Sequence, residues 1–392
     1  MSNDFDPLVA ETFDSPHVDY ARLREQCPVA HSEAWGGFWA LTKHDDVAAA
    51  AADWRTFTTS KQNVIPKVAF TGRRPPLHLD PPEHTPYRRA LAPLLGEKQI
   101  SRLEPVIRDT SRRLLATMVT RGGGDIVSDF SAPMPIATFA HWMNLTPDAV
   151  EQLTEAGRRY NIAVQSNDVE ATKETSLTLY DMARGVIADR RANPMPPAED
   201  ATSALLAARV DGEPLPDEMI VGTIRQVLVV GIIAPSVMIG SIAVHLGRDR
   251  ALQSKLRADP SLVPAAIEEF LRLYTPYRGF ARTPLHDVTI RGRTIPKDAP
   301  IALLYASANR DAEVFPEPDR FRIDRPNIRD SIAFGRGPHM CVGAPLARLE
   351  LTVALEEMLA AAPGFALDGE PRQTRFPEIG ALSVPVRFED AA

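Results

Sequence analysis

Cys341 is the residue of this chain whose setting most suggests chemistry. It lies between Gly337 and Gly343, and glycines permit a tight turn and a close approach of the backbone to a flat ligand. A helix is expected to follow at once, with Pro345 in its first turn, where the missing N–H of proline costs nothing. The amino end of that helix would direct unpaired N–H groups and partial positive charge at the sulfur, which favours a thiolate.

Two other uses of a cysteine find no support around Cys341. A zinc site needs further Cys or His ligands at short spacing, but only His339 is close and the chain has no C-x-x-C pair. A catalytic nucleophile needs a partner base, and the sequence does not single one out. A lone cysteine is usually a small inert core residue, and Cys27 is interpreted in that way.

The residues around Cys341 form a pattern that resembles the haem-binding loop of the cytochrome P450 superfamily. The pattern Phe-x-x-Gly-x-x-x-Cys-x-Gly is filled by Phe334, Gly337, Cys341 and Gly343, and Gly335 and His339 match its fuller bacterial version. Segments 80–88 (DPPEHTPYR), 269–272 (EFLR) and 318–321 (PDRF) resemble further family motifs in the family's order. The resemblance covers the chain from about residue 15 to its end.

The resemblance implies a haem b whose iron is ligated by the thiolate of Cys341. Thiolate ligation makes the iron electron-rich and favours O–O cleavage. The implied activity is therefore insertion of one oxygen atom from O2 into a small organic substrate, by hydroxylation or O-dealkylation. Haem also carries two propionates, and buried carboxylates need cationic or hydrogen-bonding partners. By resemblance these partners are His84, Arg88, Arg282 and His339.

Glu269 and Arg272 are expected to be structural. They lie one helical turn apart, a spacing that suits an ion pair. In the family such a pair belongs to a network of ion pairs. Residues 318–321 resemble the family segment that completes this network. The resemblance gives that completing position to Arg320.

The long apolar helix expected over the haem departs from the family pattern. Most relatives carry an acid and an alcohol there, which relay protons to bound oxygen, whereas this chain has Ile233 and Ala234. Pro235 cannot donate to the carbonyl of Gly231, so we expect a kink and an ordered water at that carbonyl. Ser236 could assist, although its hydroxyl could equally bond within its own helix. Gly231, Pro235 and Ser236 are thus the catalytic candidates on this helix.

Three functions stay open because of this departure. The first is a monooxygenase that receives electrons from a ferredoxin and a separate reductase. The second is a peroxide-using haem-thiolate enzyme, which needs no standard proton relay. The third is a haem-thiolate binding protein that no longer turns over.

The substrate pocket is expected to be apolar, lined by Val230, Ile233, Ala234 and Phe280. A compact aromatic molecule is the substrate that this lining favours. Arg73, Arg74 or Arg278 could meet a substrate carboxylate, although arginines are more often exposed or structural.

Electrons must come from a partner protein. The chain has no G-x-G-x-x-G turn after a strand and no set of cysteines for an iron–sulfur cluster. A small acidic donor such as a ferredoxin is expected to dock on a local basic patch, whose candidate residues are Arg88, Arg89, Arg112, Arg113, Arg336 and Arg348.

Composition limits the other partners. The net charge of −7 argues against nucleic acid, which is bound by neutralising phosphates. Two cysteines make no disulfide framework, and residues 1–6 lack the apolar core of a signal peptide. The expected location is therefore the cytoplasm. Residues 226–247 carry no Asp, Glu, Lys or Arg and could span a bilayer by length, but we expect a helix buried in the protein core.

The expected fold is mainly α with a smaller β portion, the cytochrome P450 fold, as one domain over residues 1–392. The α-rich core is placed at about 82–275 and 330–362, and the β-rich parts at about 30–75, 276–325 and 363–392. Local patterns predict a strand at 37–42, a hairpin at 288–296, a strand at 301–305 and a strong helix at 344–361.

Overall fold

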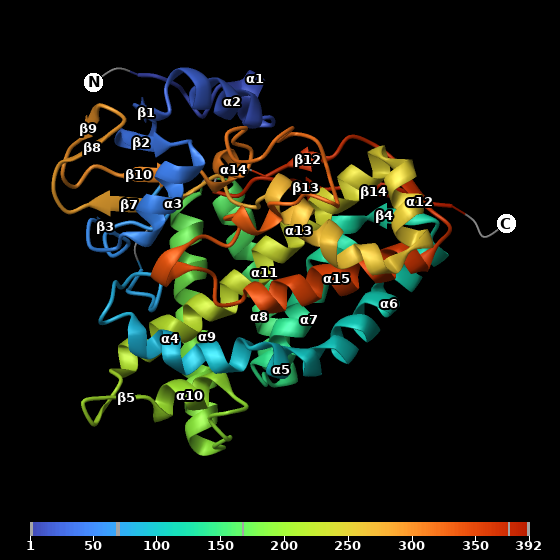
Figure 1. The fold of residues 1–392 in the computed structure, drawn as a ribbon. Coiled ribbons are helices and arrows are strands. Elements are labelled where there is room, and N and C mark those ends of the chain that lie inside the picture. Colours follow the sequence, from blue (N-terminus) through green and yellow to red (C-terminus); the bar gives the residue numbers. More distant parts are fainter. Residues whose placement is uncertain (1–2, 68–70, 167, 375–376, 390–392) are drawn as a thin grey trace.

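Helices form the bulk of the molecule (Figure 1). The computed structural model describes residues 3–67, 71–166, 168–374 and 377–389. The helices are α1 (Ala10–Phe13), α2 (His17–Gln26), α3 (His44–Ala52), α4 (Thr85–Leu91), α5 (Glu97–Ile100), α6 (Glu104–Thr120), α7 (Pro133–Trp142), α8 (Pro147–Gln165), α9 (Val169–Ala192), α10 (Ala201–Ala207), α11 (Asp217–Arg248), α12 (Arg250–Ala258), α13 (Val263–Leu273), α14 (Tyr305–Ala308) and α15 (Ala344–Ala361). Helix makes up 55% and strand 12% of the structure, which is the mainly-α composition predicted.

Helix α11 is the centre of this body. It packs against α7, α8, α9 and α15, and α15 in turn packs against α6. By length and composition α11 could cross a membrane, but 72% of its most apolar window is buried inside the protein. A helix that is apolar on all sides is expected in the core of a large protein, so the prediction of a buried core helix is confirmed.

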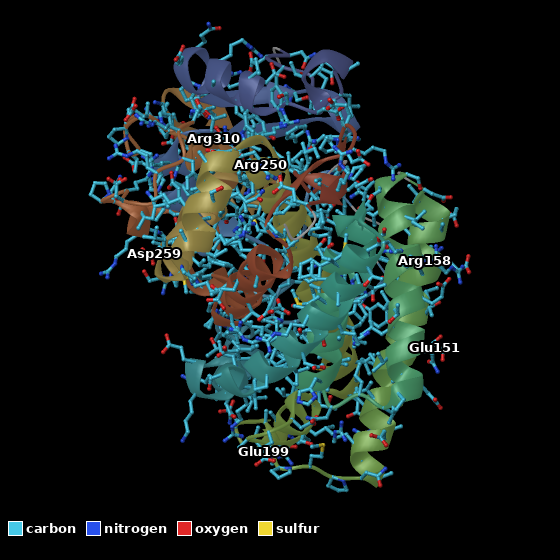
Figure 2. The ribbon with its side chains drawn as sticks, turned by 90° about the vertical axis from the view of Figure 1, so that its right-hand side faces the viewer. Glu151, Arg158, Glu199, Arg250, Asp259 and Arg310 are labelled. Atoms are coloured by element: carbon cyan, nitrogen blue, oxygen red, sulfur yellow. The ribbon has the colours of Figure 1, made fainter. Side chains whose placement is uncertain are left out.

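The outer helices show the opposite pattern. Helix α8 buries Leu153, Ala156 and Tyr160 at helical spacing, while its charged side chains, among them Glu151 and Arg158, project from the outer surface (Figure 2). Such an amphipathic helix is stabilised by the burial of one face against its neighbours, here α7 and α9.

The strands β1, β2, β3 and β7 to β10 gather at one end of the molecule, while β4 and β14 lie toward the opposite side (Figure 1). A five-stranded sheet has the order β1-β2-β10-β7-β3, with β10 parallel to β2 and the other pairs antiparallel. Smaller sheets are β11-β14-β4, β12-β13, β5-β6 and β8-β9. The strands are β1 (Val29–Ser32), β2 (Phe38–Leu41), β3 (Phe57–Thr58), β4 (Gly123–Asp125), β5 (Arg209–Val210), β6 (Glu213–Pro214), β7 (Phe280–Pro284), β8 (Val288–Ile290), β9 (Arg293–Ile295), β10 (Ile301–Leu303), β11 (Phe365–Leu367), β12 (Arg372–Gln373), β13 (Ala381–Ser383) and β14 (Pro385–Phe388).

Several local predictions are confirmed. Strand β2 lies within the predicted 37–42, and β8 and β9 form the predicted hairpin. Its turn residues Arg291 and Gly292 both have positive φ (47° and 78°), as a two-residue hairpin turn requires. Helix α15 has the predicted bounds.

Strand β4 was not predicted. It lies within the stretch of about 82–275 that was expected to be rich in helix, and it pairs with β14 near the C-terminal end. A side chain at Gly123 would overlap the carbonyl oxygen of Val386, so glycine permits this close pairing of distant segments.

Candidate active site

The Cys341 loop is a closed turn that brings the sulfur to the start of α15. The backbone N–H of Cys341 donates to the carbonyl of Phe334 at 2.8 Å. Gly335 and Gly337 both have φ of 74°, a region that favours glycine. A Cβ on Gly337 would also lie 2.6 Å from the Cα of Ala52 in α3. These two glycines are therefore required by the chain's own turn and packing.

Gly343 differs from the other two glycines. Its φ is −84°, and the nearest atom that an added Cβ would meet is the Cys341 Sγ, at 3.9 Å. The described chain does not require glycine at this position. Glycine here leaves open the space beside the sulfur, as a flat ligand on Cys341 would need.

The surroundings of the Cys341 sulfur suit a thiolate. Burial raises the pKa of the thiol above its ordinary value, and the backbone N–H groups of Gly343 and Ala344 and the cations of Arg88 and Arg348 offset this in part. The residue is nevertheless accessible. A thiol that is desolvated yet accessible faces a space inside the protein. With N–H donors behind it, this sulfur can serve as an anionic ligand.

A cluster of basic side chains gathers near the sulfur from three distant segments. His84 begins α4, Arg282 lies in β7, and His339 belongs to the Cys341 loop. The rings of His84 and His339 are 4.8 Å apart, and His339 Nε2 is 3.3 Å from Asp80 Oδ1. Burial, followed by the charges of His339 and Arg88, lowers the pKa of His84 to about 4.

This basic cluster has more donors than the described residues satisfy. The Nε2 atom of His84 is buried without a hydrogen-bond partner. Arg282 is 4% exposed and donates to the carbonyl of Ala281. Neither Arg88 nor Arg282 forms an ion pair with a described residue. A ligand with two carboxylates, such as haem, fits such a cluster because its charges would complete the missing pairs.

The middle of α11 presents an apolar face that is not packed. Val230 is 45% exposed, and Ile233 and Ala234 are partly exposed, although the neighbouring Val229 and Ile232 are buried. Positions i, i+3 and i+4 share one helix face. Phe280, also partly exposed, makes tilted ring contacts with Tyr277 and Tyr305, whose ring centroids are 4.8 Å and 6.0 Å away. The four predicted pocket residues are thus accessible apolar surface.

The hydroxyl of Ser236 lies away from the accessible face of α11. Its hydroxyl lies 3.2 Å from the hydroxyl of Ser131, in the π-helical turn Val127–Ser131. At about 100° per residue, Ser236 lies roughly 120° around α11 from Val230. It therefore faces the core and not the accessible face.

Gly231 and Pro235 also have structural surroundings. Added bulk at Gly231 would overlap the ring of Phe139 in α7, so the glycine admits that ring. Pro235 is buried, and α11 continues through it as one helix. Pro235 therefore does not lie on the accessible face of α11, whereas Gly231 is partly exposed.

The buried ion pair is present, but its expected third member is wrong. Arg272 donates to both oxygens of Glu269 at 2.8 Å and 2.7 Å. The cation that completes the network is Arg325, whose Nε lies 3.0 Å from each oxygen. Arg320 is exposed and pairs with Glu317. Only the backbone carbonyl of Arg320 takes part, because it accepts from Arg325.

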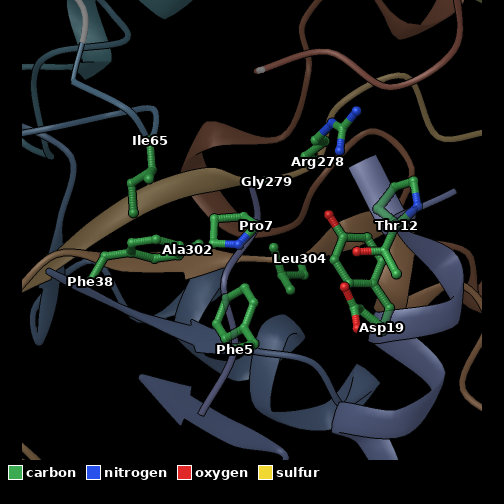
Figure 3. Close-up of a pocket in the computed structure, with 12 residues that line it drawn as sticks. Phe5, Pro7, Thr12, Asp19, Phe38, Ile65, Arg278, Gly279, Ala302 and Leu304 are labelled. Carbon is green, nitrogen blue, oxygen red and sulfur yellow. The ribbon is translucent and has the colours of Figure 1, made fainter. Parts of the chain in front are cut away.

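Arg278 has a structural role. It lines a pocket under the N-terminal segment, together with Thr12 and Asp19 (Figure 3). Its guanidinium donates to the backbone carbonyls of Phe13, Thr374 and Glu378. None of the residues lining this pocket belongs to the Cys341 loop or to α11. Arg73 is exposed. Of the three arginines that were expected to meet a substrate carboxylate, Arg74 is therefore the one that remains a candidate.

Comparison with known proteins agrees with this site. The family model for cytochrome P450 matches residues 238–369. Cytochrome P450 130 of Mycobacterium tuberculosis is 32% identical over 381 residues, 93% of this chain and 92% of that protein. The erythromycin C-12 hydroxylase of Saccharopolyspora erythraea is 33% identical over 376 residues, with the same coverage. The solved structure of CYP109Q5 from Chondromyces apiculatus has a TM-score of 0.87 at 29% identity and covers 97% of both chains.

The fold and these relatives define an oxidoreductase of the monooxygenase class with haem b as its cofactor. The chain belongs to the cytochrome P450 family. Members of this family act on small molecules with O2 and electrons from redox partners.

Proposed function

We propose that Cys341 is the axial ligand of the haem iron and that the chain oxygenates a small organic substrate held against Val230, Ile233, Ala234 and Phe280. The observation that carries this is the accessible Cys341 sulfur, backed by the N–H groups of Gly343 and Ala344. When bound, the haem supplies activation of O2 and transfer of one oxygen atom. The apolar side chains exclude water and orient the substrate.

Cofactor binding would also depend on the basic cluster and the glycines of the loop. His84, Arg88, Arg282 and His339 would hold the propionates through charge-assisted hydrogen bonds. Phe334, Gly335 and Gly337 would hold the loop in its turn, and Gly343 would leave room beside the sulfur. Supporting this assignment, His84 Nε2 is a buried donor or acceptor with no partner among the described residues.

The test compares the two cysteines of the chain. Cys341→Ser should remove the thiolate signature from the absorption spectrum of the reduced carbon monoxide complex. Cys27→Ser is the matched control and should leave that spectrum unchanged, because Cys27 is half-buried beside Arg293. An unchanged spectrum for Cys341→Ser, with haem bound, would contradict the assignment.

The electron donor we propose is a ferredoxin with a separate reductase, in the cytoplasm. Of the six candidate arginines, Arg89, Arg112, Arg113 and Arg336 are exposed. Arg348 is half-buried and paired with Glu268 at 3.0 Å, and Arg88 is half-buried near Cys341. The exposed four would attract an acidic donor, so added salt should slow reduction by that donor.

A peroxide-using enzyme is the second candidate, and the accessible face of α11 favours it. Neither Ile233 nor Ala234 can carry a proton there, and Ser236 faces away. In the first function, protons must reach the site through water. Product formed with a ferredoxin, a reductase and NAD(P)H, but not with peroxide alone, supports the first candidate. The reverse result supports the second, and tight binding without product in either assay supports a binding protein.

A further inference from the structure

Two arginines are buried side by side without an acid. Arg225 in α11 is 1% exposed, and Arg74, between β3 and α4, is 8% exposed. Among the described residues, neither forms an ion pair, and the Nε atom of each is buried without a hydrogen-bond partner. A buried charge is costly unless a counter-charge and hydrogen bonds accompany it. The pair therefore has unused capacity to bind an anion.

Neutral side chains surround the pair and satisfy it only in part. Arg225 Nη2 donates to Ser176 Oγ at 2.8 Å. Its guanidinium lies 5.2 Å from the ring centre of Tyr160 and 5.8 Å from that of Tyr180. The Tyr180 hydroxyl is itself buried without a partner. These rings stabilise a cation through their faces but bring no negative charge.

The pKa shifts around the pair also indicate a positive region without an acid. Burial lowers the pKa of Arg74, and the charge of Arg225 lowers it further. Burial, followed by the charges of Arg74, Arg225 and Arg73, lowers the pKa of His78 to about 3. No carboxylate contributes to either shift. The region is positive, and the described chain supplies no compensating acid.

The pair lies next to the substrate pocket proposed above. Arg225 precedes Val230 by five residues, which places it about 7.5 Å away along the helix axis and roughly 140° around the helix. Between them, Gln226 lies one turn from Val230 on the same side, with a buried Oε1 that has no partner. Tyr160, beside Arg225, also influences the pKa of Tyr277, as Cys341 does. Tyr160, which also shares a side-chain hydrogen bond with Arg74, thus links the pair to Tyr277, the ring neighbour of Phe280.

Gly222 fixes the position of Arg74. A side chain on this residue of α11 would overlap the carbonyl oxygen of Arg73 and approach Pro75. The glycine lets the loop carrying Arg74 lie directly on the helix that carries Arg225, so the backbones that bear the two arginines are packed together. Such preorganisation favours binding of an anion because little further ordering is needed.

We propose that Arg74 and Arg225 bind the carboxylate of the substrate, so that the enzyme acts on organic acids. This inference rests on the proposed function. The apolar part of the acid, one aromatic ring or a short alkyl chain, would extend from the arginines to Val230, Ile233 and Ala234. Guanidinium groups suit this task because they pair with a carboxylate through two parallel hydrogen bonds.

The experiment measures binding to the ferric haem-loaded protein and needs no turnover. The probes are para-alkylbenzoates and medium-chain fatty acids, and each acid is paired with its primary amide of equal shape. Binding of each probe is measured by the spin-state change in the absorption spectrum and by calorimetry. At least one acid should bind about 10-fold or more tightly than its amide, because a hydrogen bond to a charged group contributes more than a neutral one.

Variants separate this proposal from a structural role. Arg74→Gln and Arg225→Gln should each weaken acid binding about 10- to 100-fold and leave amide binding within about 2-fold. Arg73→Gln, an exposed neighbour, is the control and should change neither. If Arg225→Gln does not fold, Arg225→Lys and Arg74→Gln test the same point.

Three results would overturn the proposal. They are equal affinity of acids and amides, unchanged acid affinity in both variants, and a spin-state change with neutral compounds but with no acid. Because the readout is binding to the ferric protein, failure of oxygenation would count against the proposed function and leave this inference standing.

Discussion

Glu269 is the residue whose replacement tests the buried network most directly. Its carboxylate faces Arg272 and Arg325, and all three side chains are at most 1% exposed. Glu269→Gln keeps the shape of the side chain and removes its charge. Two buried guanidinium groups then lose their counter-charge, and breaking a buried ion pair in this way costs about 3–5 kcal/mol.

The preceding residue is a matched control. Glu268 lies on the same helix and pairs with Arg348, but the two side chains are 32% and 43% exposed. Exposed ion pairs contribute about 0–1 kcal/mol, so Glu268→Gln should change stability by no more than that. The assay is urea unfolding of the haem-loaded protein, followed by circular dichroism and haem absorbance. If the two variants differ by less than about 1 kcal/mol, the reasoning about burial is refuted.

Three further predictions concern separate parts of the chain. Arg325→Ala should lower the free energy of unfolding by about 3 kcal/mol or more, since two charge-assisted bonds to Glu269 are lost. Arg320→Ala is the control and should lower it by less than about 1 kcal/mol. Equal losses for the two variants in urea unfolding would show that the Arg320 side chain belongs to the network. Gly337→Ala should lower the free energy of unfolding by about 2–4 kcal/mol, because its φ is positive and the added methyl would overlap Ala52. Gly343→Ala should lower it by about 1 kcal/mol or less. Haem retention is measured in both variants. The lowered pKa of His78, about 3, means that the unfolded chain binds its proton more tightly. Stability should therefore be lost as pH falls from about 6.5 towards 3, and His78→Gln should make unfolding curves less dependent on pH in that window; an unchanged dependence would contradict this.

The sequence predicted the parts of the molecule that short segments specify. Glycines around Cys341 allow its turn without help from distant residues, and Pro345 together with the apolar pattern set the bounds of α15. The hairpin at Gly292 and the charge-free stretch of α11 were identified for the same reason. In each case the information lies within a few neighbouring residues, because backbone preferences and helical periodicity are local properties.

The tertiary structure decided which side chains face one another. Ser236 was a plausible relay until the packing of α11 turned it towards Ser131. Arg325 replaced Arg320 because only its side chain passes inward to Glu269. Arg74 and Arg225 are 151 residues apart, and no local pattern shows that the charge of one acts on the other. Side chains far apart in the chain become partners only when the fold brings their elements together, and burial then determines how strongly each charge needs its partner.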